Sequence, residues 1–205
     1  MSNPYLKTKF LLSVNYQKQL PFSDLEVAFA GRSNAGKSSA LNVLTAQKNL
    51  AKVSKTPGRT QLINFFTVEE NKFLVDLPGY GYAKVPEEIK AHWQNLLGNY
   101  LLKREQLRAV VLLMDIRHPM KNLDIELLEC CAERELPCHI LLTKADKLSR
   151  SNAIKALREL EAELKNWNAD FSAQIFSSLT RQGLEELIEK LNSWFFASEE
   201  LAVSS

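Results

Sequence analysis

The stretch Gly31–Ser39, GRSNAGKSS, constrains the fold of this chain most, because its glycine spacing is typical of a phosphate-binding loop. It follows the apolar run 25–30 and precedes residues 40–44, which have a helical pattern. Gly31, four residues, and then Gly36-Lys37-Ser38 match the P-loop spacing, in which backbone N–H groups and a helix N-terminus hold an anion. We therefore predict that a nucleotide's phosphates contact Gly31, Arg32, Ser33, Asn34, Ala35, Gly36, Lys37 and Ser38, with Lys37 on the β- and γ-phosphates and Ser38 on Mg²⁺.

The length and composition favour one domain. A chain of 205 residues, 45% of them hydrophobic, can bury one substantial core, and its net charge of +2 indicates no particular partner. We expect an N-terminal extension (1–22) whose residues 9–14 can add an edge strand, a nucleotide-binding domain (23–197), and a disordered tail (198–205). No apolar run approaches the roughly 18 residues of a membrane helix, and residues 1–20 lack a signal-peptide core. We therefore expect a cytoplasmic protein without membrane association, with its three cysteines reduced.

Alternating strand and helix patterns indicate the fold class. Short β-rich runs at 62–68 and 72–76 predict a hairpin, and further strands are expected at 109–115, 138–143 and 172–176. Helical patterns lie between and after them, at 122–135, 152–166 and 184–196, and an apolar stripe follows residue 87. The sequence therefore predicts a three-layer α/β fold with a mixed, mostly parallel sheet and helices on both faces. Ligands of such folds bind beyond the carboxyl ends of the strands.

Three further loops follow predicted strands and can select the nucleotide. Asp76-Leu77-Pro78-Gly79 offers a carboxylate for Mg²⁺ through water and the Gly79 N–H for a γ-phosphate. Thr143-Lys144-Ala145-Asp146 offers an ionised Asp146, which can accept two hydrogen bonds from guanine but not from adenine. The Lys144 stem is expected over the base plane, and a backbone N–H near Phe176-Ser177-Ser178 can contact the guanine carbonyl; an ordinary strand-to-loop serine pair is the alternative.

With these motifs in this order, the chain resembles the EngB family of bacterial GTPases, in the Era/EngA/TrmE-like branch of P-loop GTPases. The resemblance runs from about residue 27 to 196 and includes GRSNAGKSS, KTPGRTQ with INFF, DLPGYGYAKV, TKAD and FSS. It implies a Ras-like domain, GTP and Mg²⁺ binding, a role in assembling the large ribosomal subunit from rRNA and protein, and a link to cell division and septation. A monomer is expected.

The resemblance also implies roles for individual residues. Thr60 matches a switch threonine that closes on Mg²⁺, within the segment Gly58, Arg59, Thr60, Gln61 and Leu62. Thr143 stands where many GTPases have asparagine, so we expect a weaker tie between the base loop and the P-loop. Tyr80 replaces the glutamine that orients water in many GTPases, which predicts slow hydrolysis unless it is stimulated. Asn34 with K⁺, or Arg59 in cis, can supply the missing positive charge.

Alternatives remain open at this point. A P-loop nucleoside monophosphate kinase has a similar size, although an arginine-rich lid does not stand out. A binding module that uses GTP only as a clamp is a third interpretation. The basic residues Lys48, Lys52, Lys55 and Arg59 are the candidate rRNA contact, whereas a solvated charged face is the simpler interpretation.

Overall fold

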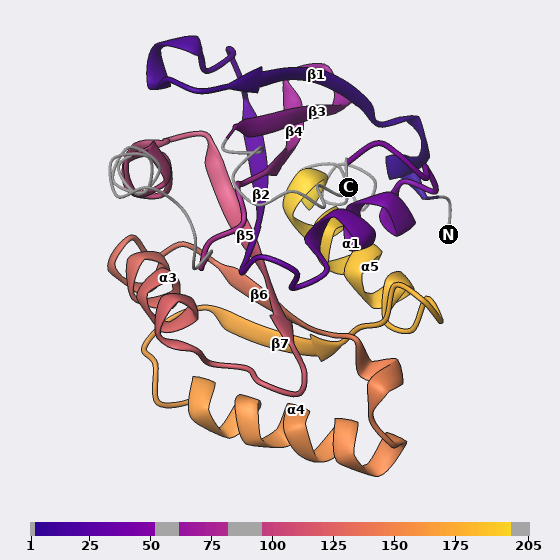
Figure 1. Ribbon diagram of the computed structural model, residues 1–205. Coiled ribbons are helices and arrows are strands. Elements are labelled where there is room, and N and C mark those ends of the chain that lie inside the picture. The colour runs from indigo at the N-terminus through magenta and orange to yellow at the C-terminus, as the bar shows by residue number, and fades with distance from the viewer. Residues whose placement is uncertain (1–2, 52–61, 82–95, 198–205) are drawn as a thin grey trace, which may run out of the picture.

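The computed structural model describes residues 3–51, 62–81 and 96–197, which build one seven-stranded sheet with helices on both faces (Figure 1). The strands are β1 (Lys9–Val14), β2 (Leu25–Gly31), β3 (Ile63–Glu69), β4 (Lys72–Asp76), β5 (Leu107–Asp115), β6 (Cys138–Thr143) and β7 (Phe171–Ile175). The α-helices are α1 (Lys37–Leu44), α3 (Asn122–Glu133), α4 (Arg150–Leu164) and α5 (Leu184–Phe195). Residues 96–103 are also helical, and single 3₁₀ turns lie at Pro4–Lys7, Gln17–Gln19 and Ala145–Lys147.

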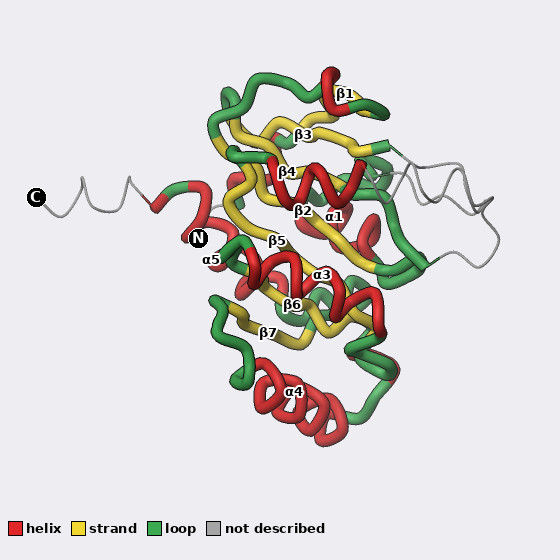
Figure 2. Tube along the Cα trace, turned by 90° about the vertical axis from the view of Figure 1, so that its left-hand side faces the viewer, coloured by secondary structure: helices red, strands yellow, loops and turns green. Residues whose placement is uncertain are grey.

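The strand order is β1-β3-β4-β2-β5-β6-β7, which Figure 2 shows from top to bottom. Strand β2 pairs in parallel with β4 and β5, and the parallel pairing continues through β6 to β7. Strand β3 is antiparallel to both of its neighbours, β1 and β4. The predicted hairpin, the extra edge strand at 9–14 and the mixed, mostly parallel sheet are therefore confirmed.

Alternate side chains of the central strands pack on opposite faces of the sheet, because successive strand residues point in opposite directions. On one face, Ala28 and Leu112 pack with helical residues 96–103, α3 and α4. On the other face, Phe29 and Leu113 pack with α1 and α5. Both faces of the inner strands are buried, which explains why these strands are almost entirely apolar in sequence.

Several element boundaries differ from the predicted ones by two or three residues. Helix α1 begins at Lys37 instead of residue 40, since Gly36 caps it in the left-handed conformation with φ of 98°. Helix α4 begins at Arg150, two residues early, because the Ser149 hydroxyl accepts the Asn152 N–H at 3.3 Å. Helix α3 ends at Glu133, two residues early, and Glu135 has a left-handed φ of 53°.

The N-terminal segment is attached to the domain by side chains as well as by β1. The Asn3 amide donates to the Leu44 carbonyl at 2.8 Å, and the Tyr5 hydroxyl donates to Asn192 Oδ1 at 3.0 Å. Tyr5 is fully buried. Asn3 and Tyr5 therefore attach the N-terminal segment to the α1–α5 face of the domain. Across the described ranges, we find no helix long and apolar enough to cross a membrane.

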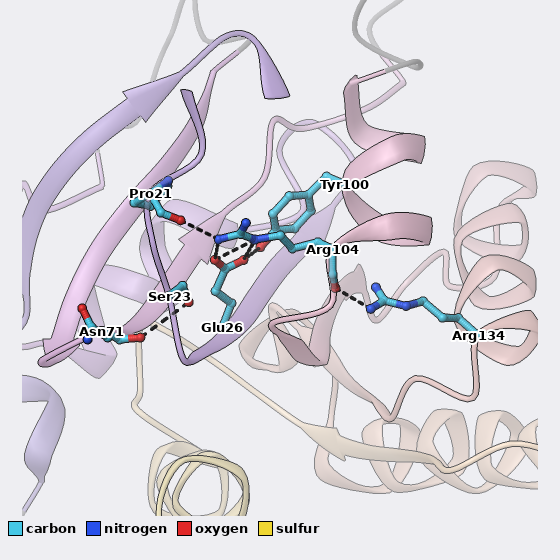
Figure 3. Close-up of polar contacts among 7 residues, drawn as sticks. All are labelled: Pro21, Ser23, Glu26, Asn71, Tyr100, Arg104 and Arg134. Carbon is cyan, nitrogen blue, oxygen red and sulfur yellow. Dashed lines mark hydrogen bonds and ion pairs between the residues drawn. The ribbon is translucent and has the colours of Figure 1, made fainter. Parts of the chain in front are cut away.

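A buried charged network lies at the amino end of β2, opposite the P-loop end (Figure 3). The Glu26 carboxylate is 0% exposed and accepts from the Tyr100 hydroxyl at 2.6 Å and from Arg104 Nε at 3.0 Å. Arg104 Nη2 also donates to the Pro21 carbonyl at 2.8 Å, and the Arg134 guanidinium donates to the Leu101 and Arg104 carbonyls. The network therefore joins β2, the end of the helical segment 96–103 and the end of α3.

Candidate nucleotide site

The candidate site lies at one edge of the sheet, where five parallel strands end. The P-loop follows β2, the segment Leu77–Gly79 follows β4, and the Lys144–Asp146 segment follows β6. Strands β5 and β7 run in the same direction and end at Asp115 and Ile175. Because parallel strands bring their carboxyl ends to one edge, these loops, far apart in the sequence, lie at the same edge of the sheet.

The P-loop backbone has the conformation that its glycines predict. A Cβ on Gly31 would lie 2.8 Å from the Leu113 carbonyl oxygen, so only glycine fits against β5. Asn34 is exposed and Gly36 half-buried, and both are left-handed, with φ of 63° and 98°. The Ala35 N–H turns back to the Arg32 carbonyl at 2.9 Å. The loop therefore curls directly before the N-terminus of α1, where backbone N–H groups favour an anion.

The lysine and the carboxylate predicted to serve the phosphates and the metal lie together. Lys37 Nζ forms an ion pair with Asp76 Oδ1, and both side chains are largely shielded from solvent. The second Asp76 oxygen accepts the Asn64 amide at 3.4 Å. Ser38, on the first turn of α1, is half-buried. A hydroxyl and a carboxylate beside a phosphate cradle are hard oxygen donors, and they fit Mg²⁺.

Gly79 and Tyr80 pack against the P-loop. A Cβ on Gly79 would lie 3.4 Å from the Ser33 nitrogen. Tyr80 accepts the Ser33 N–H at 2.7 Å and donates its own N–H to the Gly31 carbonyl at 3.3 Å. The Tyr80 ring is only 4% exposed, and its hydroxyl donates to Asp124 Oδ1 at 2.7 Å. The Tyr80 side chain therefore binds α3 and does not take the place of a water-orienting glutamine.

Thr143 ties the base loop to the P-loop. Its hydroxyl lies 2.6 Å from the Ala35 carbonyl oxygen and 3.1 Å from that of Met114, and Thr143 is 3% exposed. A Cβ on Gly36 would contact the Thr143 side chain at 3.7 Å. The Thr143 hydroxyl therefore links the two loops, and the expectation that a threonine ties them less firmly than an asparagine stays a prediction.

Neighbouring side chains hold the two residues that the sequence predicts to contact the base, Asp146 and Lys144. Asp146 Oδ1 accepts the Ser177 hydroxyl at 2.6 Å, and this hydrogen bond lowers the pKa of the carboxyl below its usual value. Asp146 therefore stays ionised near neutral pH, as an acceptor for guanine donors must. Lys144 has a left-handed φ of 59°, and its ammonium lies 3.0 Å from Asp115 Oδ2. Arg117 also donates to Asp115, at 2.7 Å, and lowers the pKa of that carboxyl.

The loop that follows β7 presents the Ser178 N–H to a ligand. Phe176 is buried, its carbonyl accepts the Ala145 N–H at 3.2 Å, and the Ser177 N–H donates to the Gln182 carbonyl at 3.1 Å. The N–H of Ser178 has no acceptor among the described residues. Of the two serines, Ser178 therefore has the N–H available for a base carbonyl, whereas the Ser177 hydroxyl orients Asp146.

Sequence reasoning missed two contributors, Asp115 and Asp124. Asp115 is the last residue of a buried strand, as Asp76 and Thr143 are. The same rule that selected Asp76 and Thr143 from the sequence would therefore have selected Asp115. Asp124 lies in the first turn of α3, where an acidic residue is common, so the sequence carried no distinguishing signal.

Some predicted residues lie outside the described ranges: Gly58, Arg59, Thr60 and Gln61, together with Lys52 and Lys55 of the basic loop. Leu62 is described and lies half-buried just before β3. Among the described residues, no group of three or more His, Cys, Asp or Glu side chains could hold a metal.

Comparison with known proteins identifies the family. Residues 26–144 match a family described as "50S ribosome-binding GTPase". The chain is 53% identical over 204 residues to "Probable GTP-binding protein EngB" of Neisseria meningitidis serogroup C, covering 98% of both chains. It is 57% identical over 192 residues to the protein of that name from Glaesserella parasuis, covering 93% of this chain and 92% of the relative.

Solved structures agree on the fold. A probable GTP-binding protein engB superposes with a TM-score of 0.63 at 22% identity, covering 81% of this chain and 96% of that one. A bacterial selenocysteine-specific elongation factor superposes with a TM-score of 0.61 at 19% identity, covering 85% of this chain and 29% of that one. The loops at this edge of the sheet and the matched relatives point to the same family, and the chain belongs to the EngB family of GTP-binding GTPases.

Proposed function

We propose that this protein is a GTP-gated switch with slow intrinsic GTP hydrolysis that acts in assembly of the large ribosomal subunit and thereby supports cell division and septation. The observation that carries the nucleotide part is the Ser177-oriented, ionised Asp146 on a loop that Thr143 ties to the P-loop. One guanosine nucleotide can then contact both loops at once. GTPase family membership favours hydrolysis over the kinase alternative.

This assignment predicts the base preference and its reversal. Isothermal titration should show binding of GTP and GDP and no measurable binding of ATP. Asp146→Asn should shift the preference to xanthine nucleotides, because xanthine presents an acceptor where guanine presents its amine. Lys37→Ala should abolish phosphate-dependent binding of either base. An unchanged base preference in Asp146→Asn would refute the assignment of Asp146.

Mg²⁺ fits the oxygen donors at this edge. Ser38 and, through water, Asp76 would hold it, and Thr60 is the proposed third contact when a γ-phosphate is bound. The bound ion would neutralise phosphate charge. For that arrangement Lys37 must turn from Asp76 to the phosphates, so the ion pair must break on nucleotide binding. Nucleotide affinity should therefore fall in Ser38→Ala when measured with Mg²⁺, and much less in EDTA.

The position of Tyr80 supports the proposal of slow hydrolysis, because its hydroxyl donates to Asp124. We propose that Asn34, exposed at the tip of the P-loop, positions K⁺ to supply positive charge between the β- and γ-phosphates. Single-turnover hydrolysis should then be faster in K⁺ than in Na⁺, and Asn34→Ala should remove the difference. Equal rates in the two salts would refute the role of K⁺. Arg59, or an activator that binds in trans, would then be the remaining source of the positive charge.

Ribosomal binding is supported by the family description, "50S ribosome-binding GTPase". Basic residues at 48, 52, 55 and 59 are the proposed rRNA contact, since phosphate contacts give salt-dependent binding. Co-sedimentation with large-subunit precursors should be stronger with a slowly hydrolysed GTP analogue than with GDP, and weaker at high salt. Binding that ignores both nucleotide and salt would refute the gated switch. In Thr60→Ala, particle binding that is lost while hydrolysis is retained would identify a GTP clamp.

A further inference from the structure

The loop that follows β4 is held both by the P-loop and by α3. The contact with α3 has no part in the nucleotide contacts proposed above. On one side, the Tyr80 backbone pairs with Gly31 and Ser33 of the P-loop through the two hydrogen bonds at 3.3 and 2.7 Å. On the other side, the Tyr80 side chain reaches α3, where its hydroxyl donates to Asp124 Oδ1 at 2.7 Å. The peptide that joins Gly79 to Tyr80 is therefore fixed between the P-loop and α3.

The Asp124 carboxylate is buried, and each of its oxygens accepts one hydrogen bond from within the protein. Its side chain is 1% exposed, and its other oxygen, Oδ2, accepts the Lys121 N–H at 3.1 Å. Both carboxylate oxygens are thus engaged inside the protein, one by the helix end and one by Tyr80. Burial raises the pKa of the Tyr80 hydroxyl well above 10, and the Asp124 charge raises it further, so the phenol remains a donor at any physiological pH.

The glycines on either side of Tyr80 lie close to the P-loop. A Cβ on Gly79 would lie 3.4 Å from both the nitrogen and the Cα of Ser33. Gly81 has a φ of 81°, and a Cβ there would lie 3.3 Å from Arg32 Nε. The Gly79 N–H belongs to the peptide between Pro78 and Gly79, which lies between two anchored residues. On one side the Leu77 N–H donates to the Phe29 carbonyl at 3.0 Å, and on the other side Tyr80 is held as described. Because this segment is short and Pro78 has a fixed φ, the direction of the Gly79 N–H depends on where Tyr80 is anchored.

We propose that Asp124 is a positioning residue that acts through Tyr80 to aim the Gly79 N–H at the γ-phosphate, and so sets the preference for GTP over GDP. This inference depends on the proposed nucleotide site, because the Gly79 N–H has a role only if a triphosphate lies on the P-loop. The hydrogen bond from Tyr80 keeps this donor aligned before the nucleotide arrives, which lowers the ordering cost of meeting the third phosphate. GDP lacks that phosphate and gains nothing from the alignment.

The test removes one oxygen atom, in Tyr80→Phe. Affinities for GDP and for a slowly hydrolysed GTP analogue are measured by titration with Mg²⁺ for the wild type and the variant. The GTP-to-GDP affinity ratio should fall about three- to tenfold, which corresponds to about 0.7–1.4 kcal/mol. GDP affinity should stay within about twofold, a margin that corresponds to a few tenths of a kcal/mol.

Tyr100→Phe is the matched control. Tyr100 also is a buried tyrosine, 1% exposed, that donates to a buried carboxylate, Glu26, at 2.6 Å, but it lies at the opposite end of β2 from the P-loop (Figure 3). Both variants should lose comparable stability in denaturant unfolding, whereas only Tyr80→Phe should change the GTP-to-GDP ratio. Equal ratios in the two variants would show that the Tyr80–Asp124 contact is merely structural.

A second variant tests the partner. Asp124→Asn should lower the GTP-to-GDP ratio in the same direction, and the double variant Tyr80→Phe/Asp124→Asn should lower it no further than the larger single effect. Additive effects, or a ratio that rises in Tyr80→Phe, would overturn the proposal. Failure of the wild type to bind either nucleotide would instead refute the proposed nucleotide site, so the two failures are distinguishable.

Discussion

Replacing Arg104 with methionine should destabilise the protein strongly without changing nucleotide binding. Glu26 is fully buried, and the guanidinium of Arg104 is its cationic partner, at 3.0 Å from Nε to Oε1 (Figure 3). Arg104→Met leaves the buried carboxylate without its cationic partner, and among the described residues the Tyr100 hydroxyl remains its one side-chain donor. Breaking a buried pair from one side costs about 3–5 kcal/mol, a large share of the roughly 5–15 kcal/mol by which domains are stable.

The stability lost through the broken ion pair in Arg104→Met can be separated from the stability lost through packing. Methionine keeps most of the apolar stem, and Arg134 contacts only the main-chain carbonyl of residue 104, so that contact survives the substitution. Tyr100→Phe removes one charge-assisted hydrogen bond and should cost less, about 1.5–3 kcal/mol. The double variant Glu26→Met/Arg104→Met removes both charges and should recover most of the loss, because buried pairs can be replaced by apolar side chains at little cost.

Urea unfolding followed by tryptophan fluorescence measures these differences. With a slope of about 1–3 kcal/mol per molar urea, Arg104→Met should lower the midpoint by at least about 1 M with the slope unchanged. GDP affinity, measured under native conditions, should match the wild type. A loss below about 1 kcal/mol in Arg104→Met, or a double variant less stable than either single variant, would refute the buried-charge reasoning.

Three further predictions follow from single contacts. Thr143→Val should weaken GTP and GDP binding alike, by about five- to tenfold, since it removes the hydrogen bond to the Ala35 carbonyl; a change in only one affinity would contradict this. Ser177→Ala should reduce the preference for guanine over inosine nucleotides, which lack the exocyclic amine, because Asp146 loses its 2.6 Å donor; unchanged discrimination would contradict that role. His139 is buried between Ser172 and Gln174, and burial lowers its pKa to about 4. The unfolded chain, with an ordinary pKa of about 6.5, binds more protons between these values, so stability should fall as pH drops from about 6.5 to 4, and His139→Asn should flatten this slope in urea unfolding.

The fold was largely predictable because its signals are local and repeated. Apolar strand runs such as 109–114 and the helical spacing of α5 indicate elements directly, and alternating strands and helices restrict the sheet to a mostly parallel arrangement. Boundaries were less predictable, since a single cap such as Ser149 or Gly36 shifts a helix start by two or three residues. Those caps depend on backbone conformation that a periodic pattern does not encode.

The sequence by itself determined which loops lie at the proposed nucleotide site, because the P-loop spacing and the Thr143–Asp146 motif follow strands that end at one edge of the sheet. Only the tertiary structure decided what holds these residues in place. Three contacts hold them, each between residues 29 to 44 positions apart in the sequence: Ser177 with Asp146, Asp115 with Lys144, and Asp124 with Tyr80. A hydrogen bond requires a donor and an acceptor to approach within about 3 Å, and that distance is set by how the strands and helices pack, not by residue type or spacing along the chain.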